Sequence, residues 1–392
     1  MINIVNKVDC CGCEACYNAC PNESIRMKSD EEGFLYPQVN QDTCVNCGLC
    51  EKVCPISNCE TKKNENQVAY LLQYKDDEVC KESTSGGAFT GIASYVIEKG
   101  GIVFGVEMTE EYKVRHTSVE TIEELKRFRN SKYVQSRVGY AFQQVRNELK
   151  RGRMVCFSGT PCQIEGLRHF LGKDYQNLIL VDVVCRAVPS PGVWEKYIQY
   201  EVEQKGKLSS IRFRDKSLGY QYSTMELRAE NGKKYRGGIE SQPWLRMFFS
   251  GMIIRPSCTD CRFRSRYRNS DFTIWDCFPS YKYDKSFDER KGTTRVLIHS
   301  EKGKKLFANI KNCFKYCEVS SDDVVQNVTE MVESPTFHSK RAEFFSEFRI
   351  LEMPQLIQKY FPITLKLELK KYVRLGLNLV DLDRIIKRYI RN

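Results

Sequence analysis

The sequence lacks any long apolar run. Nowhere in its 392 residues does a stretch of about eighteen apolar residues occur, so no transmembrane helix is predicted. The opening residues, MINIVNKVDCC, have neither the basic start nor the apolar centre of a secretory signal. Nineteen cysteines without such a signal favour metal ligation over disulfides, because a reducing compartment keeps thiols free. The sequence therefore predicts a cytoplasmic protein.

Histidine is also scarce, with four residues in the whole chain. They lie too far apart in the sequence to predict a histidine metal site, and each is expected to be a hydrogen-bonded structural residue. These residues are His116, His169, His299 and His338. Metal chemistry in this chain must therefore depend on cysteine.

The net charge of +11 does not predict a nucleic-acid partner. No known binding motif is present, and the basic residues are not interleaved with base-stacking aromatics. Residues 339–392 hold twelve Lys and Arg against six Asp and Glu, which leaves +6 in this basic tail. Peripheral contact of the tail with a membrane surface or an acidic partner stays open at this point.

Two copies of one cysteine run occupy the first 58 residues, in CCGCEACYNACP and CVNCGLCEKVCP. Each has the form C-x2-C-x2-C-x3-C-P, in which three thiolates hold one cubane and the fourth ligates the other. The predicted ligands of one 4Fe-4S cluster are Cys10, Cys13, Cys16 and Cys54, and those of the second are Cys44, Cys47, Cys50 and Cys20. Structural zinc is the alternative, but zinc would not need two complete runs. Cys11 is left over and is expected to pack or to face solvent.

Four later cysteines are candidates for a third cluster. Cys162 follows a predicted strand in FSGTPCQIEGL, Cys185 ends the next strand, and Cys258 and Cys261 form a C-x-x-C pair. Loops after the strands of a parallel sheet commonly hold ligands. The spacing leaves zinc or no metal open beside a third 4Fe-4S cluster.

The chain after the linker alternates strands and helices, which favours an α/β core with a largely parallel sheet. Residues 211–216 and 223–238 are typical of an antiparallel addition, with Asn231-Gly232 as a hairpin turn. The predicted parts are a dicluster ferredoxin domain at 1–58, a linker at 59–67, a core in two parts at 68–150 and 151–337, and a basic helical tail at 338–392.

Six segments of the core resemble the coenzyme F-420 hydrogenase/dehydrogenase beta-subunit family. They are STSGGAFTGI, SKYVQS, FSGTPCQIEGLR, DVVCRAVPSP, FRDK and RPSCTDCRFRSRYRNSDFTIWD. The resemblance covers about residues 68–337, and a dicluster ferredoxin head is common in the family. It implies FAD, a 4Fe-4S cluster near the flavin, and electron exchange between iron–sulfur centres and an organic substrate.

The resemblance also implies the FAD contacts of the α/β flavin-binding core. Small residues that open a helix let backbone N–H groups approach a phosphate, although a plain helix cap is the alternative. The implied phosphate contacts are Thr84, Ser85, Gly86, Gly87, Thr90 and Lys132, the implied contacts elsewhere on FAD are Ser131 and Tyr133, and the implied contacts to the flavin ring are Gly159, Thr160, Pro161 and Gln163.

Two segments depart from the family pattern. Arg186-Ala187 stands where many members have His-Gly, and Trp275–Pro279 stands where members typically have Gly-Asp-Phe-Trp-Gly. Both are expected near the flavin, so the substrate is deazaflavin-like or another small organic molecule. The predicted function is an FAD-dependent oxidoreductase served by a redox partner protein or low-potential electron carrier. The alternative is an electron-transfer subunit without a substrate of its own.

Overall fold

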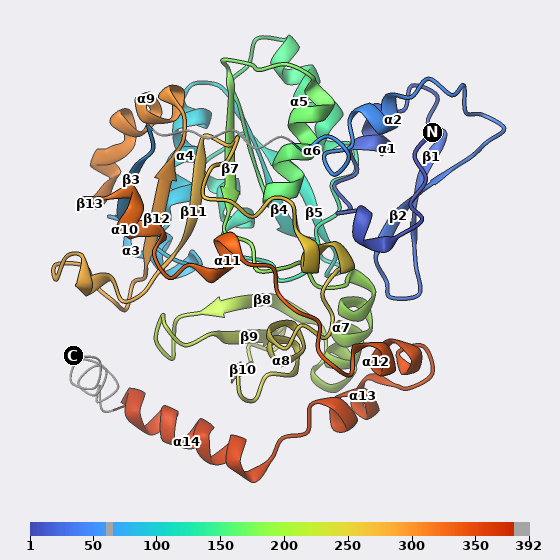
Figure 1. The fold of residues 1–392 in the computed structure, drawn as a ribbon. Helices are drawn as coiled ribbons and strands as arrows, with labels where there is room; N and C mark the ends of the chain where they lie inside the picture. Colours follow the sequence, from blue (N-terminus) through green and yellow to red (C-terminus); the bar gives the residue numbers. More distant parts are fainter. Residues whose placement is uncertain (60–65, 380–392) are drawn as a thin grey trace. The chain divides into compact units, whose positions relative to one another are not determined.

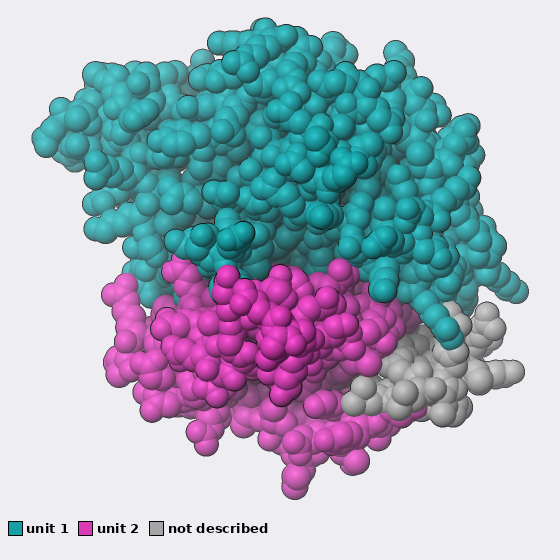
Figure 2. Space-filling view, turned by 180° about the vertical axis from the view of Figure 1, so that it is seen from behind, with its two compact units in different colours: residues 1–194, 254–336 teal, residues 195–253, 337–392 magenta. Residues whose placement is uncertain are grey.

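The structure is a computed structural model that describes residues 1–59 and 66–379. The predicted linker lies mostly outside the described residues. The chain divides into two compact units, of which unit 1 comprises Met1–Trp194 with Ile254–Thr336, and unit 2 comprises Glu195–Ile253 with Phe337–Asn392 (Figure 2). The cysteine-rich head and the main sheet both belong to unit 1.

The head folds as two matching cysteine loops joined by a hairpin. Its elements are the 3-10 helix Lys7–Asp9, α1 (Ala15–Ala19), β1 (Ile25–Ser29), β2 (Leu35–Val39) and α2 (Leu49–Lys52). The backbone is left-handed at Gly12 and Glu14 in the first loop, and at Asn46 and Gly48 in the second. These are equivalent positions of the two motifs, so the sequence repeat is also a repeat of backbone conformation. Left-handed residues let a short loop wrap tightly.

An eight-stranded sheet forms the centre of unit 1, in the order β13-β3-β12-β11-β7-β6-β4-β5 (Figure 1). Its strands are β3 (Val68–Tyr74), β4 (Ile102–Met108), β5 (Val114–Val119), β6 (Val155–Gly159), β7 (Leu178–Val183), β11 (Phe272–Cys277), β12 (Thr293–Ile298) and β13 (Phe314–Val319). Only the neighbours among β4, β6, β7 and β11 pair in parallel. The sheet is therefore mixed, and the prediction of a largely parallel sheet was wrong for its outer strands, which pair antiparallel.

Alternate residues of the central strands face two separate hydrophobic cores. Val155 and Phe157 of β6 pack toward the head, whereas Cys156 between them packs against the opposite core. The first core joins the head to α5 (Ala141–Lys150) and α6 (Pro161–Leu171), and Figure 1 shows the head beside these helices. The second core lies under α4 (Ala88–Glu98) and α9 (Glu301–Ile310). The head therefore packs directly on the sheet and its helices through a shared hydrophobic core.

Short elements complete unit 1. They are α3 (Asp77–Glu82), α10 (Ser321–Val325), α11 (Thr329–Val332), and the 3-10 helices Glu123–Phe128, Pro256–Asp260, Ser280–Lys282 and Lys311–Cys313.

Unit 2 holds a small antiparallel sheet and the C-terminal helices. Its sheet consists of β8 (Leu208–Asp215), β9 (Thr224–Ala229) and β10 (Lys234–Gly238). Gly232 is left-handed in the turn between β9 and β10, so the predicted hairpin is confirmed. The helices are α7 (Pro191–Lys205), which begins in unit 1, α8 (Pro243–Phe249), α12 (Arg341–Glu347), α13 (Met353–Tyr360) and α14 (Leu365–Leu379). None of the helices in the described ranges is long and apolar enough to cross a membrane.

Candidate functional site

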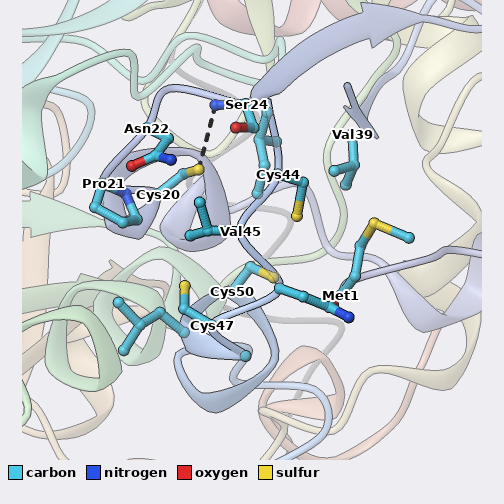
Figure 3. A pocket seen from close by; sticks show the side chains of 14 residues that line it. Met1, Cys20, Pro21, Asn22, Ser24, Val39, Cys44, Val45, Cys47 and Cys50 are labelled. Carbon is cyan, nitrogen blue, oxygen red and sulfur yellow. Dashed lines mark hydrogen bonds between the residues drawn. The ribbon is translucent and has the colours of Figure 1, made fainter. Parts of the chain in front are cut away.

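Four cysteines of the head line one pocket (Figure 3). They are Cys20, Cys44, Cys47 and Cys50. The Cys20 Sγ accepts a hydrogen bond of 3.3 Å from the backbone N–H of Ser24, and Cys47 is exposed to solvent. Cys20 thus comes from the first cysteine run and joins three thiols of the second.

Three of the remaining head cysteines belong to the hydrophobic core that the head shares with the sheet. Cys13, Cys16 and Cys54 are buried. Burial raises the pKa of the Cys16 thiol, and the nearby Cys10 and Cys54 raise it further. A Cβ atom at Gly166 of α6 would lie 2.9 Å from the Cys13 Sγ, so glycine is required for this close approach. The first cysteine loop is therefore packed directly on α6.

A second pocket is lined by the four core cysteines, and we call it the core cavity. Cys162 lies in the first turn of α6, Cys185 follows β7, and Cys258 and Cys261 lie in and just after the 3-10 helix Pro256–Asp260. Burial raises the pKa of the Cys185 thiol, with further contributions from Cys258, Cys162 and Cys261. Four thiols that are up to about a hundred residues apart in the sequence thus lie close enough for their charges to interact. No group of three or more His, Cys, Asp or Glu in the described residues is arranged to hold a single metal ion.

Charged side chains line this cavity, and the positive charges outnumber the negative one. Arg264 and Arg268 both line it, together with Glu330. Arg264 donates a hydrogen bond to the Arg186 carbonyl, and Arg268 lies 3.5 Å from the buried Asp182 carboxylate. A cubane with four thiolates carries negative charge, so soft sulfur ligands beside guanidinium groups fit a 4Fe-4S cluster.

Cys11 also lines the core cavity, although it belongs to the head. It is buried, and the neighbouring thiol of Cys13 raises the pKa of its own thiol while that of Cys162 lowers it. Of the two expectations for this spare cysteine, packing is the one that the structure supports. Cys11 thus has a thiol of the head, Cys13, and a thiol of the core, Cys162, as neighbours. The position of Cys11 in the sequence did not indicate this arrangement.

Arg255 is a site residue that the sequence analysis did not identify. It is completely buried and stacks over the rings of Phe34 and Tyr36. Its guanidinium donates hydrogen bonds to the head and the core together: Cys10 O at 2.8 Å, Cys10 Sγ at 3.5 Å, Leu35 O at 3.0 Å and Gln135 Oε1 at 3.0 Å. The only available signal was its position three residues before Cys258.

The implied phosphate contacts lie at the edge of the sheet where β3 and the parallel strands end. The Thr84 Oγ1 accepts a hydrogen bond of 2.6 Å from the backbone N–H of Ser131, and the two hydroxyls are 3.0 Å apart. Ser85 contacts Thr294 at 2.8 Å through the side-chain oxygens. Hydroxyl groups at this edge are suitable donors for a phosphate.

Gly86 and Gly87 have clear packing roles. A Cβ at Gly86 would lie 2.1 Å from the Leu72 carbonyl oxygen, and its N–H donates to the Thr294 hydroxyl. Gly87 is left-handed at the N-cap of α4, and the buried Thr90 follows in the first turn. Two glycines are therefore needed to bring this helix start against the sheet.

Lys132 is half-buried beside the implied phosphate contacts, as is Tyr133. Its ammonium donates to the carbonyls of Arg127 and Arg129 at 2.8 and 3.0 Å. Burial lowers the pKa of Lys132 to about 7, with a small opposing effect of Glu107. An ammonium has three donors, so it can hold two carbonyls and still donate to a phosphate.

The implied ring contacts form the turn between β6 and α6. The Gln163 Oε1 accepts from the backbone N–H of Thr160 at 3.0 Å, and the Gln163 amide donates to the Ser136 hydroxyl at 3.0 Å. Gly159 ends β6 and Pro161 begins α6. Residues 131–136 thus run from the Thr84 contact to the Gln163 contact and connect the two implied FAD segments. Gln163 positions the turn, and the same turn carries Cys162.

Three family models match the chain. Residues 152–323 match the C-terminal model of the coenzyme F-420 hydrogenase/dehydrogenase beta subunit, and residues 69–142 match the N-terminal model of the same protein. The chain belongs to this family. Residues 9–58 match the 4Fe-4S dicluster domain, so two 4Fe-4S clusters are expected in the head of this family member.

Comparison with solved structures found a chain of the F-420-reducing [NiFe] hydrogenase complex from Methanosarcina barkeri, studied by xenon derivatization. The identity is 14%, the TM-score is 0.42, and the match covers 78% of this chain and 95% of that chain. The comparison with curated proteins found no match. The family assignment rests on the three sequence models.

Proposed function

We propose that this family member is an iron–sulfur flavoprotein oxidoreductase with three 4Fe-4S clusters and FAD, acting on an organic two-electron substrate. The observation that carries the proposal is the convergence of Cys162, Cys185, Cys258 and Cys261 on one cavity next to the head. A chain that only carried electrons in its head would not need four thiols at the edge of the sheet. FAD, when bound, couples one-electron to two-electron chemistry.

The proposed ligand sets follow the cysteine runs and the two cavities. Cys10, Cys13, Cys16 and Cys54 hold one cluster, Cys44, Cys47, Cys50 and Cys20 hold a second, and the core cysteines hold a third. The exposure of Cys47 supports a position of the second set next to solvent, where an electron-carrier protein can approach. Cys11, which neighbours Cys10 in the sequence and lines the core cavity, supports a position of the first set close to that cavity. This order supports a route between the surface and the core.

The proposed FAD contacts are the twelve residues implied by the family. Thr84, Ser131 and Lys132 supply two hydroxyls and an amine at one end, and the Thr160 turn approaches the core cavity at the other. Ala187 also lines that cavity, and Phe278 is 41% exposed after β11. Of the two segments that depart from the family pattern, the one that contains Ala187 thus lines the core cavity, which supports a substrate other than deazaflavin.

Metal and flavin analysis tests this function. Anaerobic purification and reconstitution should give about twelve iron and twelve sulfide per chain, together with one bound FAD. A count of about eight iron would remove the core cluster from the proposal. Zinc in place of iron, or folded and iron-loaded protein without FAD affinity, would overturn the function as a whole.

We expect FAD affinity to fall as the pH rises above about 7. The pKa of Lys132 is lowered to about 7 in the free protein, and only the charged amine pairs with a phosphate. Below this pKa the amine is already charged. Above it, binding must take up a proton, so the apparent affinity should fall by up to about tenfold per pH unit. Titration of the reconstituted apo-flavin protein with FAD between pH 6 and 9 measures this slope.

The test variant is Lys132→Met, and its matched control is Lys126→Met. The first variant should bind FAD more weakly and lose the pH dependence, because it carries no titrating amine. Lys126 is exposed on the neighbouring 3-10 helix, so its variant should keep both affinity and slope. A wild-type affinity that is constant from pH 6 to pH 9 would contradict the assignment of Lys132 to a phosphate.

A further inference from the structure

Helix α14 turns an apolar stripe toward solvent. Leu365 is 85% exposed, Leu369 66%, Tyr372 64% and Val373 53%. Their spacings of four, three and one residues place them on one face of the helix. We call these four residues the α14 stripe. An amphipathic helix of a globular unit normally buries such a face, and here the face is open.

The other side of α14 packs on the rest of unit 2. Lys370 lies 3.6 Å from the buried Glu240 carboxylate, and Leu367 is half-buried. Within Leu365–Leu379 there are four basic residues, Lys366, Lys370, Lys371 and Arg374, against the single acidic Glu368, which leaves +3. The helix therefore combines an exposed apolar face with an excess of positive charge.

We propose that the α14 stripe binds an anionic lipid bilayer, with the helix lying in the plane of the interface. An exposed face of leucine and tyrosine on a helix with an excess of lysine, of which Lys366 flanks that face, is the pattern of interfacial helices. Tyrosine suits the boundary between the headgroups and the acyl chains, because its ring is apolar and its hydroxyl can stay in water. Anionic headgroups attract the lysines, and no spanning segment is needed.

The charges favour a bilayer over a protein as the occupant. Protein interfaces are depleted in lysine relative to the rest of the surface. A second copy of this chain seated on the same face would bring Lys366, which flanks the stripe beside Val373, toward its own equivalent, and like charges repel. Anionic lipid supplies the opposite charge along the whole helix. The proposal concerns unit 2 and is independent of the proposed redox function.

Vesicle flotation with the full chain tests the proposal. The protein should float with vesicles that contain phosphatidylglycerol, bind vesicles of phosphatidylcholine alone much more weakly, and dissociate as salt is raised. Leu369→Asp should reduce partitioning of the protein into anionic vesicles by about tenfold or more. The change removes an apolar side chain that the bilayer would bury, and it adds a negative charge. Leu369→Gln should weaken binding in the same direction and keeps a good helix former.

The control is Ile350→Asp, the same kind of change at a residue of unit 2 that is 76% exposed and lies outside α14. It should float like the wild type. Wild-type protein that stays unbound with anionic vesicles would overturn the proposal, as would equal binding by wild type and Leu369→Asp. A wild-type oligomer that Leu369→Asp dissociates, without any vesicle binding, would also overturn it and assign the stripe to a protein interface.

Discussion

Replacement of Cys258 by Ser should remove about four of about twelve iron atoms per chain and leave both head clusters in place. Cys258 lines the core cavity, where burial and its neighbours Cys162 and Cys261 raise the pKa of its thiol to about 12. A serine hydroxyl is a poor ligand for iron, which requires a thiolate here. No head thiol lines the core cavity except the spare Cys11. Iron and sulfide analysis after anaerobic reconstitution measures the loss.

Cys258→Ser should lose the core cluster without losing the head clusters or FAD. Electron paramagnetic resonance of the reduced protein should keep the signals of the head clusters, while FAD should still bind, because its proposed contacts include no residue of the C-x-x-C pair. Cys313→Ser is the matched control, since Cys313 is exposed and far along the chain in the 3-10 helix Lys311–Cys313. It should retain all iron. If Cys258→Ser also retains all iron, the pair is structural and the third cluster does not exist.

Replacement of Arg255 by Met should lower the free energy of unfolding by about 3–5 kcal/mol. The guanidinium is completely buried, and its loss leaves the carbonyls of Cys10 and Leu35 and the Gln135 amide oxygen without their donor. Each buried acceptor that loses its partner costs about 1–3 kcal/mol. Urea unfolding of the reconstituted protein under anaerobic conditions measures the change.

Arg255 should also affect the reduction potential of the head cluster that includes Cys10. The guanidinium lies 3.5 Å from the Cys10 Sγ, and a nearby positive charge stabilises the added electron. Arg255→Met should therefore shift the midpoint potential of that cluster to a more negative value, whereas Arg255→Lys should keep most of it while losing stability, because lysine cannot form the planar fork. A redox titration followed by electron paramagnetic resonance distinguishes the variants.

Arg151→Met is the control for both measurements. Arg151 is 71% exposed and pairs with Glu148 at the surface, so its removal should change stability by less than about 1 kcal/mol. The potential of each cluster should be unchanged. An Arg255→Met protein with wild-type stability and potential would show that the buried contacts of Arg255 contribute nothing to the site.

The sequence alone determined the parts of this protein whose signals are local. Two cysteine runs of fixed spacing specify the dicluster head, because the ligands of a cubane come mainly from one short loop. The same holds for the individual strands and helices, such as β6 followed by the Thr160 turn and α6, where alternating apolar residues and a turn signal lie within twenty residues.

Only the tertiary structure decided what lies together. Sheet pairing sets which loops share an edge, and it brought Cys162, Cys185 and the Cys258–Cys261 pair to one cavity across about a hundred residues. The same pairing makes the sheet mixed. Packing of the head on the core buries Arg255 between them and brings the spare Cys11 next to Cys162. The division into units joined residues 195–253 with the C-terminal helices. These features depend on long-range packing, which no local spacing or periodicity records.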